Sequence, residues 1–210
     1  MMELAALDLA CVRAGRDVFR NVEFSLRGGE MLAITGPNGA GKSSLLRLIA
    51  GLLPPARGQV TLRGGDAELT VGEQAHYVGH LDAFKPSLTV GENLAFWNAV
   101  LAGGSGVASA LASVGLDALA HLPALYLSAG QRRRLSLARL LVAARPIWLL
   151  DESSSTLDAA GAAMLAEVMA KHLAGGGLIL AAEHGRLALA PTRELRMGQS
   201  APGPGAGTPS

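Results

Sequence analysis

Eight residues near the start of the chain constrain its fold more than any other feature. Residues 36–43 read G-P-N-G-A-G-K-S and match the pattern G-x-x-x-x-G-K-[ST]. They follow a continuous apolar run, residues 31–35, and precede a segment with leucines at helical spacing that begins near Lys42. A glycine-rich turn between a buried strand and a helix can wrap its N–H groups around a phosphate. The sequence therefore predicts an α/β fold that binds a nucleotide.

Each residue of this loop has an expected role. Lys42 is expected to reach the β- and γ-phosphates, and the Ser43 hydroxyl is expected to bind Mg²⁺. The other expected nucleotide-binding positions are Gly36, Pro37, Asn38, Gly39, Ala40, Gly41 and Ser44. The pattern thus indicates ATP and Mg²⁺ as cofactors.

An acidic pair follows a second apolar run. Residues 147–151 read I-W-L-L-D, and Glu152 comes next. Asp151 is expected to hold Mg²⁺, and Glu152 is expected to polarise the attacking water. Neighbouring side chains of an extended strand point to opposite sides, which would give the two carboxylates separate roles. The alternative, that the pair only caps a helix, is weaker beside a phosphate-binding loop.

The remaining pattern predicts a mixed core interrupted by helices. Strands are predicted at residues 3–12, 22–26, 31–35, 59–62, 75–78, 147–151 and 178–182. Only helical segments are predicted between residues 86 and 144, and two capping boxes, at Thr89–Glu92 and Ser128–Gln131, mark helix starts. The hexamer L-T-V-G-E-Q at 69–74 recurs as L-T-V-G-E-N at 88–93, which we interpret as a coincidence.

These patterns suggest one domain and a tail. We expect a single domain over residues 1–197, with a helical insert at about 86–144. Residues 198–210 contain four Gly, three Pro and no charged residue, so we expect this tail to be disordered. The N-terminus lacks the basic and apolar segments of a signal peptide, and the longest uncharged stretch, 93–116, is broken by G-G-S-G. We therefore expect no membrane span.

Charge and cysteine content exclude several classes of function. The chain has 18 Lys and Arg against 17 Asp and Glu, so no overall field attracts nucleic acid. The run at residues 132–134, R-R-R, could bind nucleic acid, but a solvated helix face is the better interpretation. One cysteine, Cys11, excludes an internal disulfide and a cysteine metal cluster, which fits a reducing compartment.

Further motifs resemble those of the ABC ATPases. Residues 127–131, L-S-A-G-Q, are similar to the family signature L-S-G-G-Q, and residues 155–158, S-T-L-D, resemble its D-loop. His184, which lies 33 positions after Asp151, resembles the switch histidine that contacts the γ-phosphate. The resemblance, which covers residues 3–198, implies a P-loop NTPase core with an antiparallel β edge and an inserted α-helical subdomain. It also implies a homodimer, because Ser128, Ala129, Gly130 and Gln131 would face ATP bound to the other protomer.

Four positions depart from the family pattern. Ala129 replaces a signature glycine, and Ser153 replaces the usual proline after the catalytic glutamate. His80 stands where the lid glutamine is expected, and it could still provide a water or metal contact. Arg13 stands where the family has an aromatic residue that stacks on adenine, and its guanidinium plane could stack instead.

Within the family, the chain is similar to the ATP-binding subunits of the bacterial cytochrome c maturation system. This likeness implies a peripheral position on the cytoplasmic face of the inner membrane, beside polytopic membrane subunits. ATP hydrolysis would drive haem delivery or release of a haem-loaded chaperone, although no C-x-x-C-H or other haem ligand set is present in the sequence. Two alternatives stay open: an ABC ATPase for another cargo, and a non-transport ABC ATPase.

Overall fold

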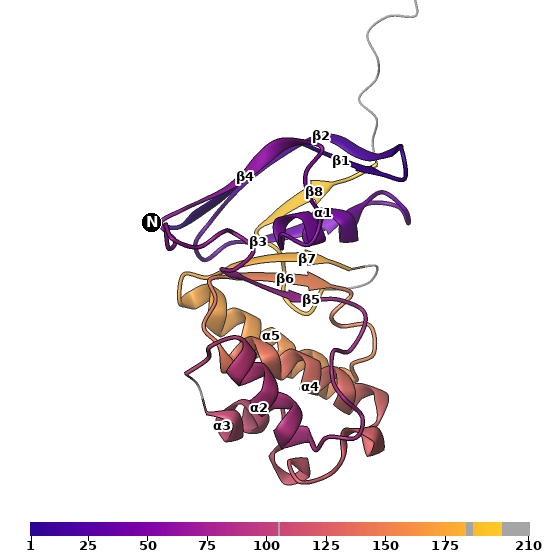
Figure 1. Ribbon diagram of the computed structural model, residues 1–210, viewed down its shortest axis with the longest axis vertical. Coiled ribbons are helices and arrows are strands. Elements are labelled where there is room, and N and C mark those ends of the chain that lie inside the picture. Colours follow the sequence, from indigo (N-terminus) through magenta and orange to yellow (C-terminus); the bar gives the residue numbers. More distant parts are fainter. Residues whose placement is uncertain (105, 184–186, 199–210) are drawn as a thin grey trace, which may run out of the picture.

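The computed structural model describes residues 1–104, 106–183 and 187–198, and their strands form two sheets (Figure 1). The strands are β1 (Glu3–Arg13), β2 (Arg16–Arg27), β3 (Met31–Thr35), β4 (Arg57–Arg63), β5 (Ala75–Val78), β6 (Ile147–Asp151), β7 (Leu178–Ala182) and β8 (Arg193–Arg196). The α-helices are α1 (Lys42–Ile49), α2 (Val90–Val100), α3 (Val107–Ser113), α4 (Ala129–Val142) and α5 (Ala159–Ala174). Two 3-10 turns lie at Asp117–Leu119 and Ala124–Tyr126.

The first sheet is antiparallel and has the strand order β2-β1-β4. Glu3 pairs with Arg27 on one side of β1 and with Arg63 on the other. Strands β2 and β4 are longer than the sequence predicts, because their exposed ends carry polar residues without an apolar alternation. This sheet is the antiparallel edge that the family resemblance implies.

The second sheet is parallel and has the order β5-β6-β7-β3-β8. All residues of β6 and β7 are buried, which explains why these strands are continuous apolar runs. The edge strand β8, R-E-L-R, carries no such run and was not predicted. The carboxyl ends of β3 and β6, which precede the glycine-rich loop and Glu152, lie on the same edge of this sheet.

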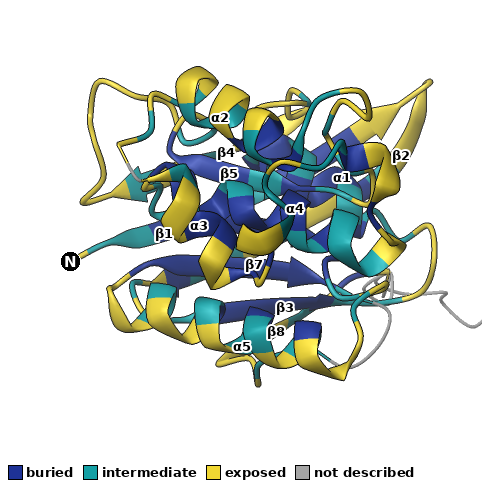
Figure 2. Ribbon diagram, turned by 90° about the horizontal axis from the view of Figure 1, so that it is seen from below, coloured by how far each residue is buried: buried dark blue, intermediate teal, exposed yellow. Residues whose placement is uncertain are grey.

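The two faces of the parallel sheet have different coverings. Helix α1 packs between the two sheets, in a core that includes Leu4, Leu45 and Leu149 (Figure 1). Helices α4 and α5 cover the other face, where Leu137 and Met169 pack on it. Figure 2, which looks onto this helical side, shows the buried parallel strands behind helices whose outer faces are exposed. This layering confirms the predicted α/β class.

The helical segment after residue 86 has a core of its own. Val90 and Leu94 of α2 pack with Leu111 of α3 and Leu135 of α4. Both predicted capping boxes are present at the starts of α2 and α4. The predicted tail lies outside the described residues except for Gly198.

The repeated hexamer, which the sequence analysis interpreted as a coincidence, forms the same local structure twice. In each copy the threonine and glutamate exchange capping-box hydrogen bonds, and the final amide side chain is buried. That amide bonds main-chain groups eight, five and four residues earlier. The residues concerned are Thr70, Glu73 and Gln74 in the first copy and Thr89, Glu92 and Asn93 in the second. Each hexamer therefore closes the loop before it through one buried amide.

In the described part of the chain, no helix combines the length and the apolar character needed to cross a lipid bilayer.

Candidate nucleotide site

The glycine-rich loop between β3 and α1 requires glycine at both ends. Gly36 has φ 136°, and a Cβ atom there would lie 2.4 Å from the carbonyl oxygen of Met197. Gly41, the residue before α1, has φ 94°, and a Cβ atom there would lie 2.7 Å from Cγ1 of Val18. The side chains of other amino acids have no room at these positions, so the loop can curve tightly over the start of α1.

Lys42 folds back over this loop. Its Nζ donates hydrogen bonds to the carbonyl oxygens of Gly36, at 2.7 Å, and Pro37, at 3.1 Å. Lys42 is only 7% exposed, whereas residues 37–39 of the loop are exposed. A positive charge and a helix start thus meet at a loop open to solvent, which suits a bound phosphate.

Asp151 lies beside this loop. The Ser43 hydroxyl donates to Oδ1 of Asp151 at 2.9 Å, and the Tyr77 hydroxyl donates to Oδ2 at 2.9 Å. Tyr77 also accepts a hydrogen bond from Nε of Arg47 at 3.1 Å, and burial raises the pKa of Tyr77. The sequence analysis missed Tyr77, whose position in the short strand β5 carries no motif.

Glu152 does not continue the strand as expected. β6 ends at Asp151, and Glu152 has φ 55°, in the left-handed region. Its N–H donates to the carbonyl oxygen of Ala182 at 2.8 Å. The two carboxylates are therefore separated by a sharp turn of the main chain and not by the alternation of an extended strand.

The arginine run at residues 132–134 is also different from the expectation. Arg133 is only 2% exposed, so the prediction of a solvated face is wrong for this residue. It donates to three main-chain carbonyl groups around the acidic pair and the end of β5. Arg134 instead forms an ion pair with Asp158 at 2.8 Å. A run of three like residues gave no signal that its middle member is buried.

Another missed residue is Glu183, which follows β7. Its carboxylate accepts hydrogen bonds from the Ser153 hydroxyl at 2.8 Å and from both the N–H and the hydroxyl of Ser154, at 3.1 and 3.0 Å. The serine that replaces the family's proline thus has a partner of its own. His184, the next residue, lies outside the described residues.

The signature segment lies on the other side of the parallel sheet from α1. Ser128 and Gln131 form the capping box of α4, with Ser128 exposed at its start. Ala129 is exposed, and a Cβ atom on Gly130 would lie 3.5 Å from the carbonyl oxygen of Thr156 in the D-loop segment. α4 and α1 cover opposite faces of the sheet, so one chain does not bring these two helix starts together (Figure 1).

Two expected site residues stay at the surface. Arg13 is exposed at the end of β1, opposite Arg16, and His80 is exposed after β5. Among the described residues, no group of three or more His, Cys, Asp or Glu side chains could hold a metal ion.

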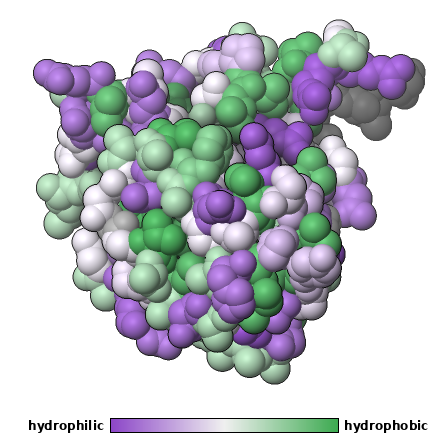
Figure 3. All heavy atoms as spheres, turned by 60° about the horizontal axis from the view of Figure 1, so that its bottom comes forward, coloured by the Kyte–Doolittle hydropathy of each residue, from purple (hydrophilic) through white to green (hydrophobic). Residues whose placement is uncertain are grey.

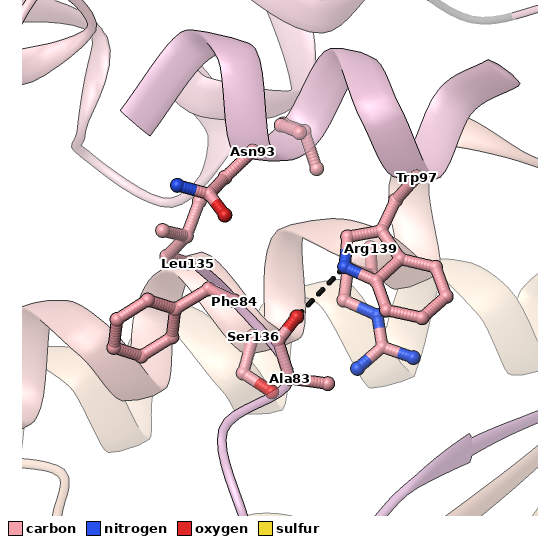
Figure 4. Close-up of a pocket in the computed structure, with 8 residues that line it drawn as sticks. Ala83, Phe84, Asn93, Trp97, Leu135, Ser136 and Arg139 are labelled. Atoms are coloured by element: carbon pink, nitrogen blue, oxygen red, sulfur yellow. Dashed lines mark hydrogen bonds between the residues drawn. The ribbon is translucent and has the colours of Figure 1, made fainter. Parts of the chain in front are cut away.

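An aromatic groove lies between the end of β5 and the helical segment. Trp97 of α2 donates through Nε1 to the carbonyl oxygen of Ala83 at 2.8 Å, and the Arg139 guanidinium lies 3.8 Å from its ring centre (Figure 4). Phe84, the next residue along the chain, lines the same pocket, with its ring on the side away from Trp97 (Figure 4). Burial lowers the pKa of Arg139 to about 10. A neighbouring opening of about 230 Å³ is lined by Phe84, Lys85, Leu88 and Phe96, among others.

Comparisons with known proteins agree with this geometry. Residues 19–155 match the family model described as ABC transporter. The chain is 61% identical to the cytochrome c biogenesis ATP-binding export protein CcmA of Nitrobacter winogradskyi, over 95% of this chain and all of that protein. It is 58% identical to the protein of the same name from Bradyrhizobium diazoefficiens, over 94% of this chain and 98% of that protein.

Solved structures support the same fold. A putative ABC transporter ATP-binding protein from Pyrococcus furiosus superposes with a TM-score of 0.80 at 21% identity, covering 93% of this chain and 97% of that one. An ATP-binding subunit of an ABC transporter superposes with a TM-score of 0.76 at 27% identity, covering 86% and 79%. With its phosphate loop, acidic pair and capped signature helix, the chain belongs to the ABC transporter family as an ATP-binding domain.

Proposed function

We propose that this chain is the ATP-hydrolysing subunit of an export complex for cytochrome c biogenesis, which drives haem delivery or release of a haem-loaded chaperone. The observation that carries this proposal is the identity, 51–61% over at least 94% of the chain, to eight relatives that share the name cytochrome c biogenesis ATP-binding export protein. Each alignment covers nearly the whole length of the relative, so the likeness is not confined to the phosphate loop.

Phosphate binding falls to the loop between β3 and α1. Lys42 already lies across this loop, and its bonds to the Gly36 and Pro37 carbonyls can be exchanged for bonds to phosphate oxygens. The start of α1 adds the positive end of a helix dipole. Residues 36–44 would thus hold the triphosphate.

The residues beside the loop fit Mg²⁺. The Ser43 hydroxyl and the Asp151 carboxylate, 2.9 Å apart, supply two hard oxygen donors, and Mg²⁺ usually takes only one or two protein ligands besides phosphates and water. When bound, Mg²⁺ neutralises charge on the β- and γ-phosphates. Tyr77 orients the Asp151 carboxylate through Oδ2.

Glu152 is the residue that we assign as general base. It stands directly after the Asp151 carboxylate, on a turn that aims it away from the strand direction. A carboxylate so placed can take the proton of the attacking water. His184 keeps its proposed role at the γ-phosphate on the strength of the sequence alone, and Arg13 and His80 keep theirs at the adenine and the lid.

The second half of the site would come from another copy of the chain. The capped start of α4 is exposed, and it carries a positive dipole end without reaching the phosphate loop of its own chain. In a head-to-tail pair, residues 128–131 of each protomer would cover the ATP held by the other. A homodimer therefore completes two sites at once.

The aromatic groove offers a place for the membrane partner. Phe84 borders both the groove and the neighbouring opening, Phe96 lines that opening, and the exposed Leu81 lies three positions before Phe84. Figure 3 shows hydrophobic patches among hydrophilic side chains on the helical face. A polytopic subunit docked here, on the cytoplasmic side of the inner membrane, would contact the segment that follows β5, so a movement of this segment would be passed to the subunit.

The proposal is tested in a strain whose chromosomal copy carries Glu152→Gln. Because the amide keeps the shape of the side chain but cannot take a proton, hydrolysis should fall about 10²–10⁴-fold. We expect c-type cytochromes to be lost as completely as in a deletion strain while b-type haem proteins remain. Haem staining of membrane proteins measures the first, and reduced-minus-oxidised spectra measure the second.

A matched change separates charge loss from loss of the base. Glu68→Gln makes the same substitution at an exposed position and should leave c-type cytochromes at wild-type amounts. Normal c-type cytochromes in the Glu152→Gln strain would overturn the proposed role. Loss of both cytochrome classes would point to another cargo.

A further inference from the structure

The loop that carries Glu152 is held on one side by a buried arginine. Arg133 of α4 donates from Nη2 to the carbonyl oxygen of Glu152 and from Nε to that of Ser153, both at 2.9 Å. Its side chain is 3% exposed. Two bonds from one planar guanidinium fix the direction of two successive peptide groups.

The same guanidinium also reaches the segment after β5. Nη1 of Arg133 donates to the carbonyl oxygen of Gly79 at 2.7 Å and lies 3.6 Å from Oδ1 of Asp82. This segment leads toward the aromatic groove. One side chain of α4 therefore connects residues 79–82, which we call the lid segment, to residues 152–154, which we call the acidic loop.

A carboxylate holds the acidic loop from the other end. Glu183 accepts three hydrogen bonds from Ser153 and Ser154, and the preceding residue, Ala182, accepts the N–H of Glu152. Burial lowers the pKa of Arg133, and the negative charges of Asp82 and Glu183 oppose that effect. The loop thus lies between a buried cation and an anion, each bonded to its main chain.

This support has a physical reason in the conformation of Glu152. A left-handed φ of 55° is unfavourable for a residue with a side chain, so the surrounding structure must maintain it. Removing the bonds on either side would let the turn relax and displace the Glu152 carboxylate.

We infer that Arg133 and Glu183 are positioning residues that together hold the Glu152 carboxylate in its reactive place, and that Arg133 links this geometry to the lid segment at residues 79–82. The inference rests on the proposed function, because it takes Glu152 as the base. The inference predicts that a movement of the lid segment displaces Glu152, because the Arg133 guanidinium is bonded to both.

The test compares variants of the full chain purified with its membrane partners. Arg133→Lys keeps the charge but cannot make the fork of bonds, and Glu183→Ala removes all three acceptor contacts, whereas Glu183→Gln keeps an acceptor oxygen. Each is made in the wild-type chain and in the Glu152→Gln chain. Steady-state hydrolysis gives kcat and KM, and equilibrium binding of a non-hydrolysable ATP analogue gives Kd.

The control is a second arginine that bonds a main-chain carbonyl elsewhere. Arg145 donates to the carbonyl oxygen of Ala75 at 2.9 Å, at the other end of β5. Arg145→Lys should leave kcat unchanged.

We expect Arg133→Lys and Glu183→Ala to lower kcat about tenfold to a hundredfold, as displacement of a catalytic group does, with Kd within about twofold. Glu183→Gln should recover part of the loss. In the Glu152→Gln chain neither change should lower the residual rate further, because both act through that side chain. A residue with a merely structural role would instead raise Kd and lower the residual rate in both chains.

The outcomes separate this inference from the proposal on which it rests. If Glu152→Gln itself leaves the rate unchanged, the base assignment and the inference both fail. If Glu152→Gln stalls hydrolysis while Arg133→Lys and Glu183→Ala keep kcat within about twofold, only the inference fails. If Arg133→Lys does not fold, the comparison of Glu183→Ala with Glu183→Gln tests the inference alone, because Glu183 is partly exposed.

Discussion

Single residues at the acidic pair show how main-chain strain serves a site. Glu152 leaves the strand in the left-handed region, and its N–H and carbonyl groups are both bonded, to Ala182 and to Arg133. Strained residues persist where the surrounding structure fixes them, and such positions gather at functional sites. The strain places one carboxylate on the turn while Asp151 stays buried beside Ser43.

This strain can be measured by comparing two truncations. Glu152→Gly and Glu152→Ala both remove the carboxylate, but only glycine adopts φ 55° without a Cβ clash. We expect the glycine variant to unfold with a free energy about 1 kcal/mol higher than that of the alanine variant. Urea denaturation measures this difference, and equal or reversed stabilities would show that the turn is unstrained.

At the scale of secondary-structure elements, a buried histidine joins two of them. His76 of β5 is 5% exposed, and its Nε2 lies 2.8 Å from the carbonyl oxygen of Ala143 at the end of α4. Burial lowers the pKa of His76 to about 4. The folded state therefore keeps this ring neutral at pH values where an unfolded chain would protonate it.

The sign of the resulting pH dependence follows from linkage. The unfolded histidine titrates near its ordinary pKa of about 6.5, so its contribution to stability is complete above that pH and declines as the pH falls toward 4. When the pH falls from 7.5 to 5, the free energy of unfolding should decrease in both proteins. The decrease should be about 2 kcal/mol smaller in His76→Gln than in the wild type. His121→Gln, at an exposed position, is the control, and an identical pH dependence in all three proteins would contradict the assignment.

The elements that the sequence predicts well share a physical cause. β3, β5, β6 and β7 were predicted with their observed bounds. β3, β6 and β7 are central strands, and both faces of such a strand demand apolar residues, while the edge strand β5 still buries three of its four residues. The edge strand β8 has no such demand and was missed. Helix starts were predicted because a capping box satisfies its N–H groups within four residues.

The parts of the site that escaped prediction depend on contacts between distant segments. The phosphate loop is local, so its eight residues reveal it, whereas Arg133, Glu183 and Tyr77 contact partners 19 to 74 positions away. The common structure of the two hexamers escaped prediction for a related reason. This structure depends on buried amides that bond the preceding loops, and a repeated sequence alone does not show burial.

At the scale of the whole molecule, the parallel sheet separates the two helix starts that we propose as the halves of one ATP site. α1 with Lys42 covers one face, and α4 with the exposed Ser128 covers the other (Figure 1). Both helix starts carry positive dipole ends suited to phosphate. A second copy of the chain, turned head to tail, is the simplest way to bring one of each to a single nucleotide.

Mixing two inactive chains tests this arrangement. Lys42→Ala removes the phosphate contact, and Ser128→Arg blocks the start of α4, so each alone should be inactive. An equal mixture should recover about a quarter of the wild-type rate, because about half of the pairs are mixed and each mixed pair has one intact site of two. Each variant alone at the same total concentration is the control.

The outcome is checked independently by crosslinking. A chain with cysteines at positions 42 and 128, in a Cys11→Ser background, should crosslink between protomers only. No recovery of activity in the mixture, together with a crosslink inside one chain, would refute the head-to-tail pair.

Separation of the two helix starts by the sheet also bears on inheritance. A chain altered at Lys42 would still fold and still present its signature helix, so it would complete the ATP site of an intact partner although its own site had failed. In a cell that makes both forms in equal amounts, about half of the pairs would be mixed and each would keep one intact site, so about half of all sites would remain intact. Alleles that change Lys42 would therefore cost the cell no more activity than alleles that prevent folding, and both would be recessive.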